Sequence, residues 1–587
     1  MKKKFLTGGC IVLLGAAILI RVGIVPTNTV DTEQQESVAE EQQGNSAEGE
    51  RSDRNFDEIS NNREYSDVDK ADLYSISSQV SLQKDDTSDI ILRNGLPALE
   101  RMSSEDSTEL MGDLQVLKRV ETLKENVEEF NTPEYNWKKL YEDSLDTVDR
   151  MLNNFEREKT FTGKKASELN VFLKKNVGNK IIINVPKLEL DETIVIPSDT
   201  WLIGNDVKVE GKEDNIIEYG ILGEKVSNVC VEGIHFNGNL KHAIYFISSN
   251  QVLINNNTIE NSYNKGVVVM GTCQYVNIVR NSIFNNGDGA IYLDGKISNG
   301  IIENNVINGN HGAGNLSAAI ALSSVPIQDV YTPYNQAQDE YLYDIVEVPF
   351  DNVIRENKIK YGYSSGIYSH GAYKNYIIDN QIIESDKEGI CLDFGSFGTY
   401  VSNNDIINNG GRKRQSDSDL QQDFIEEYGR MEDGSSPAKL PGISLDNAAY
   451  NLLVGNKISK NYGSGVKMVR SSYRNLIMNN EISDNNYGEN DYFHFFGVEM
   501  GYAKKPDQEV KGMDFTSDYE NIVCRNVITG KHYSGVFFDT ETYCNDLFDN
   551  VIIDSENFSV ECISNKFNSV VGNCTSGEMR GVNIEEK

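Results

Sequence analysis

The sequence predicts an all-β solenoid: a right-handed parallel β-helix of about 13 coils, preceded by an N-terminal helical region. Three observations lead to this prediction. An Asn that follows an apolar pair recurs at steps of 23 or 24 residues, or at one such step plus an insertion. A strand of the form Gly-apolar-x-apolar-x recurs in phase with it. The 587 residues include 48 glycines and only 11 prolines, which is typical of a glycine-punctuated β protein.

The repeated Asn defines the coils. Successive strands of a β-helix lie about 4.8 Å apart, so equivalent residues of neighbouring coils form ladders. An inward Asn at a bend can bond the backbone of the next coil and satisfy groups that the bend would leave unpaired. We therefore expect the β-helix to span residues 177–580 with an Asn ladder along it. The ladder positions are Asn257, Asn281, Asn305, Asn357, Asn380, Asn404, Asn456, Asn480, Asn526, Asn550 and Asn573.

Residues 1–26 are predicted to be an export signal or a membrane anchor. Three lysines precede an uncharged apolar run over residues 5–20, and a short apolar stretch follows Arg21. A basic flank before such a run is typical of a signal peptide or of an anchor whose N-terminus stays inside. Because no small-x-small cleavage site follows, we favour the anchor. The protein is expected at the cell surface, anchored to the plasma membrane, or secreted if the segment is cleaved.

The charge of the chain excludes some partners. Its 90 acidic and 55 basic residues give a net charge of −35, which disfavours binding to nucleic acid or to anionic membrane. Residues 27–104 are acidic and poor in apolar side chains, so we expect a disordered tether there. We therefore expect no nucleic-acid partner, membrane contact only through the N-terminal anchor, and a monomer.

Residues 105–176 are predicted to be helical. Their apolar residues recur at steps of three and four, which is the period of an amphipathic helix. A solenoid needs capped ends, so this region is expected to shield the first coil; a folding or binding module is the alternative. The apolar positions are Leu114, Leu117, Val120, Leu123 and Val127, then Trp137, Leu140, Leu145, Val148 and Leu152, and finally Leu169, Phe172 and Leu173.

The Gly-apolar-x-apolar-x strands predict an outward face on which polar residues cluster. Their second and fourth positions are almost always apolar and should point inward, so the third and fifth should point outward. His370, Asp393 and Asp446 then lie on three successive rungs, within about 10 Å. Stacked carboxyl groups raise the pKa of one member, which suits acid–base chemistry. Solvated surface, or a site for a structural cation, is the alternative.

The same alignment defines two outward columns. The fifth positions are Met270, Asp294, Ser323, His370, Asp393, Asp446, Val469, Gly501 and Asp539. The third positions are Val268, Tyr292, Ala321, Tyr368, Cys391, Ser444, Lys467, Glu499 and Phe537.

Three insertions leave the coils beside these columns, near residues 325–349, 410–441 and 502–518. The first is rich in tyrosine, whose ring and hydroxyl suit sugar rings. Long loops of this kind are more often functional than idle, so together they are expected to wall a cleft. The second carries a basic run at Arg412, which would suit an acidic glycan instead.

Three classes of function remain open. A glycoside hydrolase needs two carboxyl groups, whose separation sets the stereochemistry. A polysaccharide lyase or epimerase needs a base and commonly Ca²⁺, and a surface lectin needs neither. No zinc-ligand spacing, phosphate-binding loop or nucleophile elbow occurs, so we expect no required cofactor and no catalytic metal, and leave a structural Ca²⁺ open. The cysteines fit buried free thiols better than bridges.

Several stretches carry a resemblance to known proteins. The segment KIIINVPKLELDETIVIPSDTWLIG resembles the opening of the pectin-lyase-like superfamily. The stretches SDKEGICLDFGSFGTY, GRMEDGSSPAKLPGISLDNAAYN, NYGSGVKMVRSSYRN and FHFFGVEMG resemble the lacto-N-biosidase family, glycoside hydrolase family 136. This resemblance implies a retaining exo-type hydrolase that releases lacto-N-biose, Gal-β1,3-GlcNAc, with two catalytic Asp residues seven positions apart. Asp386 and Asp393 match that pattern.

A second Asp pair has the same spacing, Asp539 and Asp546. We prefer Asp386 and Asp393, because Asp393 adjoins His370 and Asp446. Seven residues of extended strand would separate the two carboxyl groups by over about 20 Å, so the chain has to bend before Gly389. Asp393 is expected to be the acid/base. The candidate substrate-binding residues are His370, Tyr368, Asp446, Lys467, Arg470, Glu499 and Asp294.

Overall fold

The structure is a computed structural model. It describes residues 137–581 except 212–215, 313, 324–347, 394, 412–438, 471, 487–493, 502–517, 540–541 and 564–567. The expected anchor, the acidic tether, the helices before residue 137 and most of the three insertions therefore lie outside the described residues. Within the described ranges, no helix is long and apolar enough to cross a membrane.

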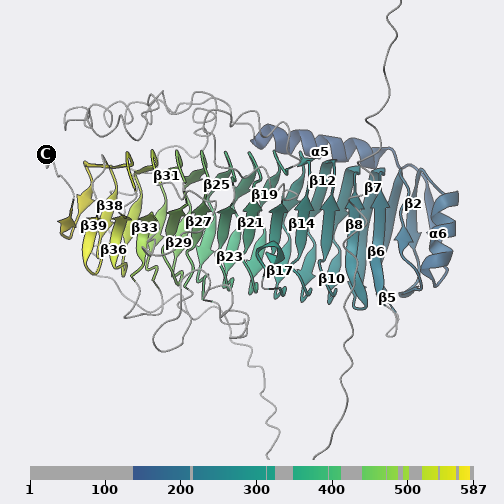
Figure 1. Ribbon diagram of the computed structural model, residues 1–587. Coiled ribbons are helices and arrows are strands. Elements are labelled where there is room, and N and C mark those ends of the chain that lie inside the picture. Colours follow the sequence, from purple (N-terminus) through teal and green to yellow (C-terminus); the bar gives the residue numbers. More distant parts are fainter. Residues whose placement is uncertain are drawn as a thin grey trace, which may run out of the picture. The chain divides into compact units, whose positions relative to one another are not determined.

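The described strands form a parallel β-helix, as predicted. They belong to a 28-stranded sheet, sheet A, and a 14-stranded sheet, sheet B, and the strands of each sheet pair in parallel (Figure 1). Sheet A consists of two stacks of strands, ladder A1 and ladder A2, joined where single long strands run through both. Each full coil thus contributes one strand to A1, one to A2 and one to sheet B.

The strands of ladder A1 alternate with those of the other two stacks along the chain. Ladder A1 contains β1 (Glu158–Phe161), β2 (Asn179–Ile183), β5 (Thr200–Gly211), β7 (Ser227–Asn237), β9 (Asn250–Asn255), β12 (Cys273–Val279), β15 (Ile297–Ser298), β16 (Ile301–Glu303), β19 (Val353–Arg355), β22 (Tyr376–Ile378), β25 (Tyr400–Ser402), β28 (Leu452–Val454), β31 (Leu476–Met478), β34 (Ile522–Cys524), β37 (Asp546–Phe548) and β40 (Ser569–Val571).

Ladder A2 contains the C-terminal halves of β5 and β7 together with β3 (Lys187–Leu190), β10 (Thr258–Glu260), β13 (Ser282–Phe284), β17 (Val306–Asn308), β20 (Lys358–Lys360), β23 (Gln381–Ile383), β26 (Asp405–Ile407), β29 (Lys457–Ser459), β32 (Glu481–Ser483), β35 (Val527–Thr529), β38 (Val551–Ile553) and β41 (Cys574–Thr575).

Sheet B contains β4 (Ile194–Val195), β6 (Ile217–Glu224), β8 (Leu240–Ile247), β11 (Val267–Met270), β14 (Ile291–Asp294), β18 (Ile320–Ser323), β21 (Ile367–His370), β24 (Ile390–Asp393), β27 (Ile443–Asp446), β30 (Val466–Val469), β33 (Phe496–Met500), β36 (Ser534–Phe538), β39 (Phe558–Cys562) and β42 (Met579–Arg580).

The predicted Asn ladder is confirmed, and it lies at the bend between A1 and A2. Asn404 shows the pattern: its backbone N–H and its Nδ2 both donate to Oδ1 of Asn456, at 3.0 and 2.9 Å. Its Nδ2 also donates to the carbonyl of Ile377, 2.8 Å away. The residue before it, Asn403, has a left-handed φ of 54°, which turns the chain at the bend. Each Asn thus satisfies backbone groups of the neighbouring coils.

Two further Asn ladders mark the other bends, and the sequence analysis missed them. One precedes the A1 strands, for example Asn451, whose Oδ1 accepts the backbone N–H of Thr399 at 2.9 Å. The other follows the A2 strands, for example Asn461, whose Oδ1 accepts the backbone N–H of Asn409 at 3.0 Å. The sequence holds a signal for all three, because Asn451, Asn456 and Asn461 are spaced by five residues, and this spacing recurs.

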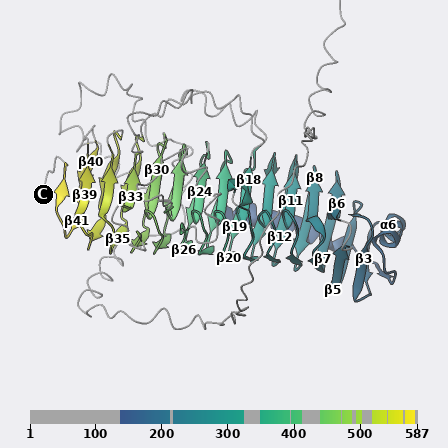
Figure 2. The same ribbon diagram turned by 60° about the horizontal axis from the view of Figure 1, so that its bottom comes forward.

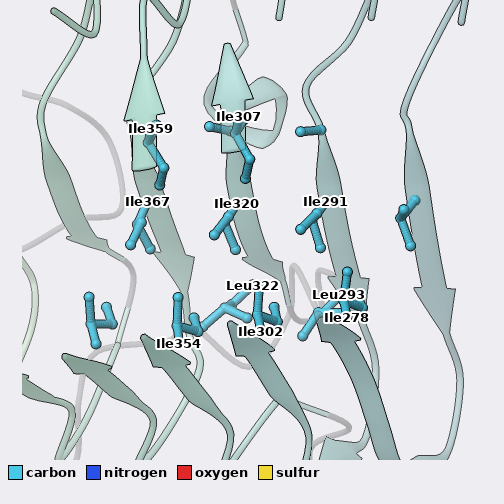
Figure 3. Packing of buried hydrophobic residues seen from close by; sticks show 14 of the residues in the cluster. Ile278, Ile291, Leu293, Ile302, Ile307, Ile320, Leu322, Ile354, Ile359 and Ile367 are labelled. Atoms are coloured by element: carbon cyan, nitrogen blue, oxygen red, sulfur yellow. The ribbon is translucent and has the colours of Figure 1, made fainter. Parts of the chain in front are cut away.

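The core is a set of aliphatic stacks inside the coils. Inward positions of sheet B, such as Ile291, Ile320 and Ile367, stack from coil to coil opposite the isoleucines of sheet A (Figure 3). This core leaves no room for a side chain at the Gly that precedes β24. A Cβ at Gly389 would lie 2.4 Å from Cγ2 of Ile406, closer than any side chain tolerates.

Two helices cover different parts of the solenoid. Helix α6 (Ala166–Lys175) lies at the first coil, where Leu169 and Leu173 are fully buried in the main core. Helix α5 (Trp137–Asn153) lies along ladder A1 instead (Figure 1). The expected apolar face of α5 is wrong at Leu145, which is 37% exposed, because the buried side of the helix runs through Ser144, Thr147, Val148 and Met151.

Candidate active site on sheet B

The strands of sheet B lie side by side along the solenoid (Figure 2). Their register confirms the two outward columns. His370 pairs with Asp393, and Asp393 pairs with Asp446, so these three residues lie on successive rungs. In the neighbouring column, Tyr368 pairs with Cys391. The second and fourth strand positions point into the core, as expected. The strands themselves therefore bring this polar cluster together.

Tyr368 connects Asp393 to His370. Its hydroxyl donates to Oδ2 of Asp393 at 2.8 Å and lies 3.0 Å from Nδ1 of His370. A hydroxyl has one proton to give, so the contact with His370 requires Nδ1–H to donate to the tyrosine oxygen. The other ring nitrogen, Nε2, is then unprotonated whenever the imidazole is neutral. Tyr368 and Asp393 are only 2% and 4% exposed.

Burial sets the protonation of this cluster. It lowers the pKa of His370, so the imidazole is neutral at pH 7. It also raises the pKa of Tyr368, and the charge of Asp393 adds to this effect. The phenol therefore stays protonated and available as a hydrogen-bond donor.

Asp446 provides a second carboxylate one rung away. Its Oδ2 lies 3.3 Å from Nη1 of Arg470, which favours the ionised form. Paired residues of adjacent parallel strands lie about 4.8 Å apart, so Asp393 and Asp446 are neighbours on one face. The negative charge of Asp446 favours a protonated carboxyl beside it. On the same strand as Asp393, Cys391 has a pKa raised by burial and by Glu388, Asp393 and Asp446, so it stays a thiol.

Lys467 and Glu499 form an ion pair on the next rungs. Nζ of Lys467 lies 2.8 Å from Oε1 of Glu499, and Ser464 donates to the other carboxylate oxygen at 2.5 Å. Both residues lie in the outward column that the third strand positions form, as expected. They continue the polar face on the C-terminal side of Asp446.

Asp518 is a buried carboxyl that the sequence analysis missed. It accepts the backbone N–H groups of Ser472 and Gly501, each at 2.7 Å. Burial raises its pKa to about 7, opposed by these two hydrogen bonds and strengthened by Asp446. Asp518 lies three residues before Asn521. Ser396 and Ser472 occupy the equivalent positions of two other coils. An Asp in that column of small polar residues was the available signal.

Asp386 lies in the bend that leads into β24. The chain turns at Asp386 and Lys387 before the strand begins at Ile390. Asp386 is 3% exposed, and its backbone N–H donates to the carbonyl of Gly362 at 2.8 Å. Asp386 therefore lies before the N-terminal end of β24, whereas Asp393 is the last residue of that strand.

A hydrogen-bond chain connects this bend to Asp393. Nζ of Lys387 donates to Oδ1 of Asn315 at 2.8 Å, in the short 3₁₀ helix η2 (Asn315–Ser317). The side chain of Asn315 hydrogen-bonds Tyr368, which in turn bonds Asp393. The residue next to Asp386 is thus three hydrogen bonds away from Asp393.

Asp294 belongs to a separate cluster three rungs away. Its Oδ2 accepts the hydroxyl of Tyr292 at 3.0 Å, and Nζ of Lys265 lies 4.8 Å from the centre of that tyrosine ring. Lys265 also pairs with Asp288 at 3.0 Å. The register places Ser323 and His370 between Asp294 and Asp393. Asp294 therefore lies three rungs from Asp393 on the N-terminal side, as Glu499 lies three rungs away on the C-terminal side.

The rival pair lies on two different sheets. Asp539 follows the sheet B strand β36, and its backbone N–H donates to the carbonyl of Met500 at 3.0 Å. Asp546 lies in β37 of ladder A1, is fully buried, and accepts the hydroxyl of Ser569. The seven-residue spacing therefore places Asp539 and Asp546 on different sheets, because the chain between them passes from sheet B to sheet A.

The cysteines of the described residues are thiols. Seven of them are free, and six of these are buried. The described residues contain no cluster of three or more His, Cys, Asp or Glu side chains that could hold a metal ion.

Comparisons with known proteins agree with the architecture. Residues 201–324 match the family model "Right handed beta helix region", and residues 335–491 match the model "Periplasmic copper-binding protein (NosD)". A search of curated protein sequences found no match.

Solved structures that resemble the chain include three carbohydrate-acting enzymes. The A-module of the Azotobacter vinelandii mannuronan C-5 epimerase AlgE6 is 13% identical, with a TM-score of 0.41 over 71% of this chain and 99% of its own. The periplasmic alginate epimerase AlgG is 13% identical, with a TM-score of 0.39 over 82% and 98%.

The third is the catalytic domain of a GH87 alpha-1,3-glucanase, 10% identical, with a TM-score of 0.33 over 72% of this chain and 68% of its own. The strand pairing and the family model together identify the fold of this chain as a right-handed parallel β-helix.

Proposed function

We propose that this protein is a glycoside hydrolase and that sheet B carries its active site. The proposed reaction is that of glycoside hydrolase family 136, the release of Gal-β1,3-GlcNAc from an oligosaccharide. The resemblance of four sequence stretches supports the family, and one structural observation supports the chemistry. Asp393 is a buried outward carboxyl bonded by Tyr368, and Asp446, which contacts Arg470, lies one rung away.

Asp393 suits the role of acid/base. A general acid has to hold a proton at neutral pH, and the charge of Asp446 favours the protonated form of its neighbour. Tyr368 donates to Asp393 and so stabilises the carboxylate after the proton has left. The same carboxylate can then accept a proton from water in the second half of the reaction.

The proposed mechanism is double displacement. A carboxylate attacks the anomeric carbon while Asp393 protonates the glycosidic oxygen, and the bond between that carbon and oxygen breaks. Water, deprotonated by Asp393, then attacks the glycosyl ester and releases the sugar with retained configuration. An alternative is that an acetamido group of the substrate supplies the nucleophile and an Asp orients it.

Two carboxylates are candidates for the nucleophile. Asp386 is the candidate implied by the family resemblance, since it stands seven residues before Asp393. Asp446 is the candidate that the register favours, since retaining enzymes hold their carboxyl groups about 5–5.5 Å apart and neighbouring rungs lie about 4.8 Å apart. We propose Asp386 and take Asp446 as the residue to test against it.

Hydrolysis of an aryl lacto-N-bioside tests the function. The native protein is expected to release the aryl alcohol together with Gal-β1,3-GlcNAc, whose first-formed anomer is the β form if configuration is retained. No release from this substrate or from lacto-N-tetraose would contradict the assignment.

One observation favours a second candidate, a lyase or epimerase that acts on acidic glycans. The hydroxyl of Tyr368 lies 3.0 Å from Nδ1 of His370. The phenol keeps its proton and the imidazole is neutral, so one group can give a proton and the other can accept one, as needed to remove and return a proton next to a carboxylate. The negative charges of Asp446 and Glu388 would repel a polyuronate, which is why we rank this candidate second.

Incubation with polygalacturonate or polymannuronate in the presence of Ca²⁺ distinguishes this candidate. A lyase produces unsaturated ends that absorb in the ultraviolet, and an epimerase changes the anomeric proton spectrum. Either result would replace the hydrolase proposal. Binding of glycans without any product would indicate a lectin.

A further inference from the structure

Ladder A1 carries a long apolar stripe on its outer surface. In each three-residue strand from β22 to β37, the middle residue points inward and the two flanking residues point outward. Most of the outward side chains are large and apolar. These outward residues are Tyr376, Ile378, Tyr400, Leu452, Val454, Leu476, Met478, Ile522, Cys524 and Phe548, and we refer to them as the A1 stripe. They form a cluster of their own, separate from the core inside the coils.

The A1 stripe is buried although it faces outward. None of its side chains is more than 5% exposed, and Tyr376, Cys524 and Phe548 are fully buried. Ladder A2 shows what an uncovered outward position looks like, because Val306 there is 47% exposed and Lys358 is exposed as well. Stacking within a ladder therefore does not account for the burial, and the stripe requires a cover.

Helix α5 covers only the coils before the stripe. Beyond its C-terminal end, Phe155 packs against Trp201 of β5, and at its N-terminal end Trp137 stacks on Arg355 of β19. Its 17 residues span about 25 Å, which equals the five steps of about 4.8 Å from β5 to β19. Of the described side chains, only Trp137, Leu140 and Tyr141 of α5 reach the start of the cluster.

The N-terminal end of α5 lies next to the start of the stripe, which α5 does not cover. Because Trp137 lies over β19, the N-terminal end of α5 is one rung before the stripe. Pro133 disfavours one continuous helix through α5 and the segment before it. From β22 to β37 the stripe is five steps long, about 24 Å, which a helix of about 16 residues spans. Residues 105–132 are long enough.

The upstream sequence also has the required amphipathic pattern. Leu114, Leu117, Val120, Leu123 and Val127 fall on one side of a helix drawn at 100° per residue. The opposite side is polar and holds Gln115, Lys118, Thr122, Glu125 and Glu129. A helix with this pattern has one face to bury and one to leave in water.

We propose that an amphipathic helix within residues 105–132 docks on the A1 stripe and extends along β22 to β37 the cover that α5 provides from β5 to β19. The occupant of this surface is thus a segment of the same chain. Docking leaves the A2 surface uncovered, which agrees with the exposed charged residues Lys358, Lys457 and Glu481 on that ladder.

Hydrogen exchange of the full-length chain tests the proposal. Amides of the helix within residues 105–132 are expected to exchange at least about tenfold more slowly than those of residues 27–104, because docked segments open rarely. Val127→Asp places a charge on the apolar side and is expected to reduce this protection by at least about tenfold. Thr122→Asp, which replaces a β-branched residue on the polar side, is expected to change it by less than about twofold.

Three results would overturn the proposal. The first is exchange throughout residues 105–132 in the native chain as fast as that of the acidic tether. The second is equal protection in the Val127→Asp and Thr122→Asp variants. The third, measured by light scattering, is a dimer that persists in Val127→Asp, which would mean that a second copy covers the stripe. The first needs no variant, so a poorly folding variant leaves the test intact.

Discussion

Tyr368 is the side chain on which the polar contacts of sheet B converge. Its hydroxyl bonds Asp393 and lies within hydrogen-bond distance of His370, and the side chain of Asn315 bonds it too. A phenylalanine fits the same space and removes only the hydroxyl.

Tyr368→Phe is expected to lower kcat by about 10²-fold, because Asp393 loses the donor that stabilises its charged form. The fold should be unchanged by circular dichroism. Tyr245→Phe is the matched control, since Tyr245 lies in the same outward column four rungs away. Equal activity of Tyr368→Phe and the native enzyme would remove this tyrosine from the mechanism.

Asp518 predicts how stability depends on pH. Its pKa is about 7 in the folded protein against an ordinary 3.8, so the folded state keeps a proton that the unfolded chain releases. Stability from this group is therefore present below pH 3.8 and lost as the pH rises to about 7. The loss is about 1.4 kcal/mol per pH unit within that window.

Asp518→Ser isolates this effect, because serine occupies the equivalent place at Ser396 and Ser472. The difference in unfolding free energy between this variant and the native protein should shift in favour of the variant from pH 4 to pH 7. Denaturant titration at several pH values measures it. A difference that does not change with pH would show that Asp518 ionises normally.

At the scale of elements, the Asn ladders hold the coils together. Asn456 accepts two hydrogen bonds from Asn404 and donates to Val401 and Asn480. Asn456→Ala leaves several buried groups unpaired, at about 1–3 kcal/mol each. The midpoint of thermal unfolding should therefore fall clearly. Asn573→Ala, at the half-buried end of the same ladder, should have a much smaller effect, and equal effects would contradict the ladder as a source of stability.

The sequence predicted elements better than it predicted what covers them. One Asn ladder, the outward columns of sheet B and the helix α6 followed from periodicity, because a coil repeats its inward positions every turn. The path of α5 did not, since an amphipathic pattern says which side is buried and not against what. Leu145 illustrates this limit, because its side chain is 37% exposed although the period places it on the apolar side.

The candidate site was predicted in part for a similar reason. Alignment of coils is a local property, so the positions of His370, Asp393 and Asp446 could be derived from the repeat. The hydrogen bonds of Asn315 and Lys387 depend on how a turn folds over the neighbouring coil, and no repeat encodes them. The rival pair shows the same limit, because spacing alone could not reveal that Asp546 belongs to sheet A.

At the scale of the whole molecule, one face of the solenoid carries the candidate active site and another carries an apolar packing surface. Sheet B presents buried carboxylates, a tyrosine and a histidine, whereas ladder A1 presents a covered apolar surface. Substitutions in the A1 stripe should therefore reduce thermal stability, while substitutions of Asp393 or Tyr368 should reduce turnover and leave the unfolding midpoint nearly unchanged. Measuring both quantities for Met478→Ala and Asp393→Asn tests the division. It would be contradicted if Met478→Ala lost turnover at full stability.

The most direct test of the central claim is the hydrolysis of an aryl lacto-N-bioside by the native protein and by four variants, Asp393→Asn, Asp386→Asn, Asp446→Asn and Asp539→Asn. The account predicts that Asp393→Asn and Asp386→Asn each lose several orders of magnitude in kcat, that Asp539→Asn stays active, and that all four keep the native circular dichroism spectrum. An inactive Asp446→Asn beside an active Asp386→Asn would move the nucleophile to Asp446. An active Asp393→Asn together with an inactive Asp539→Asn would contradict the account.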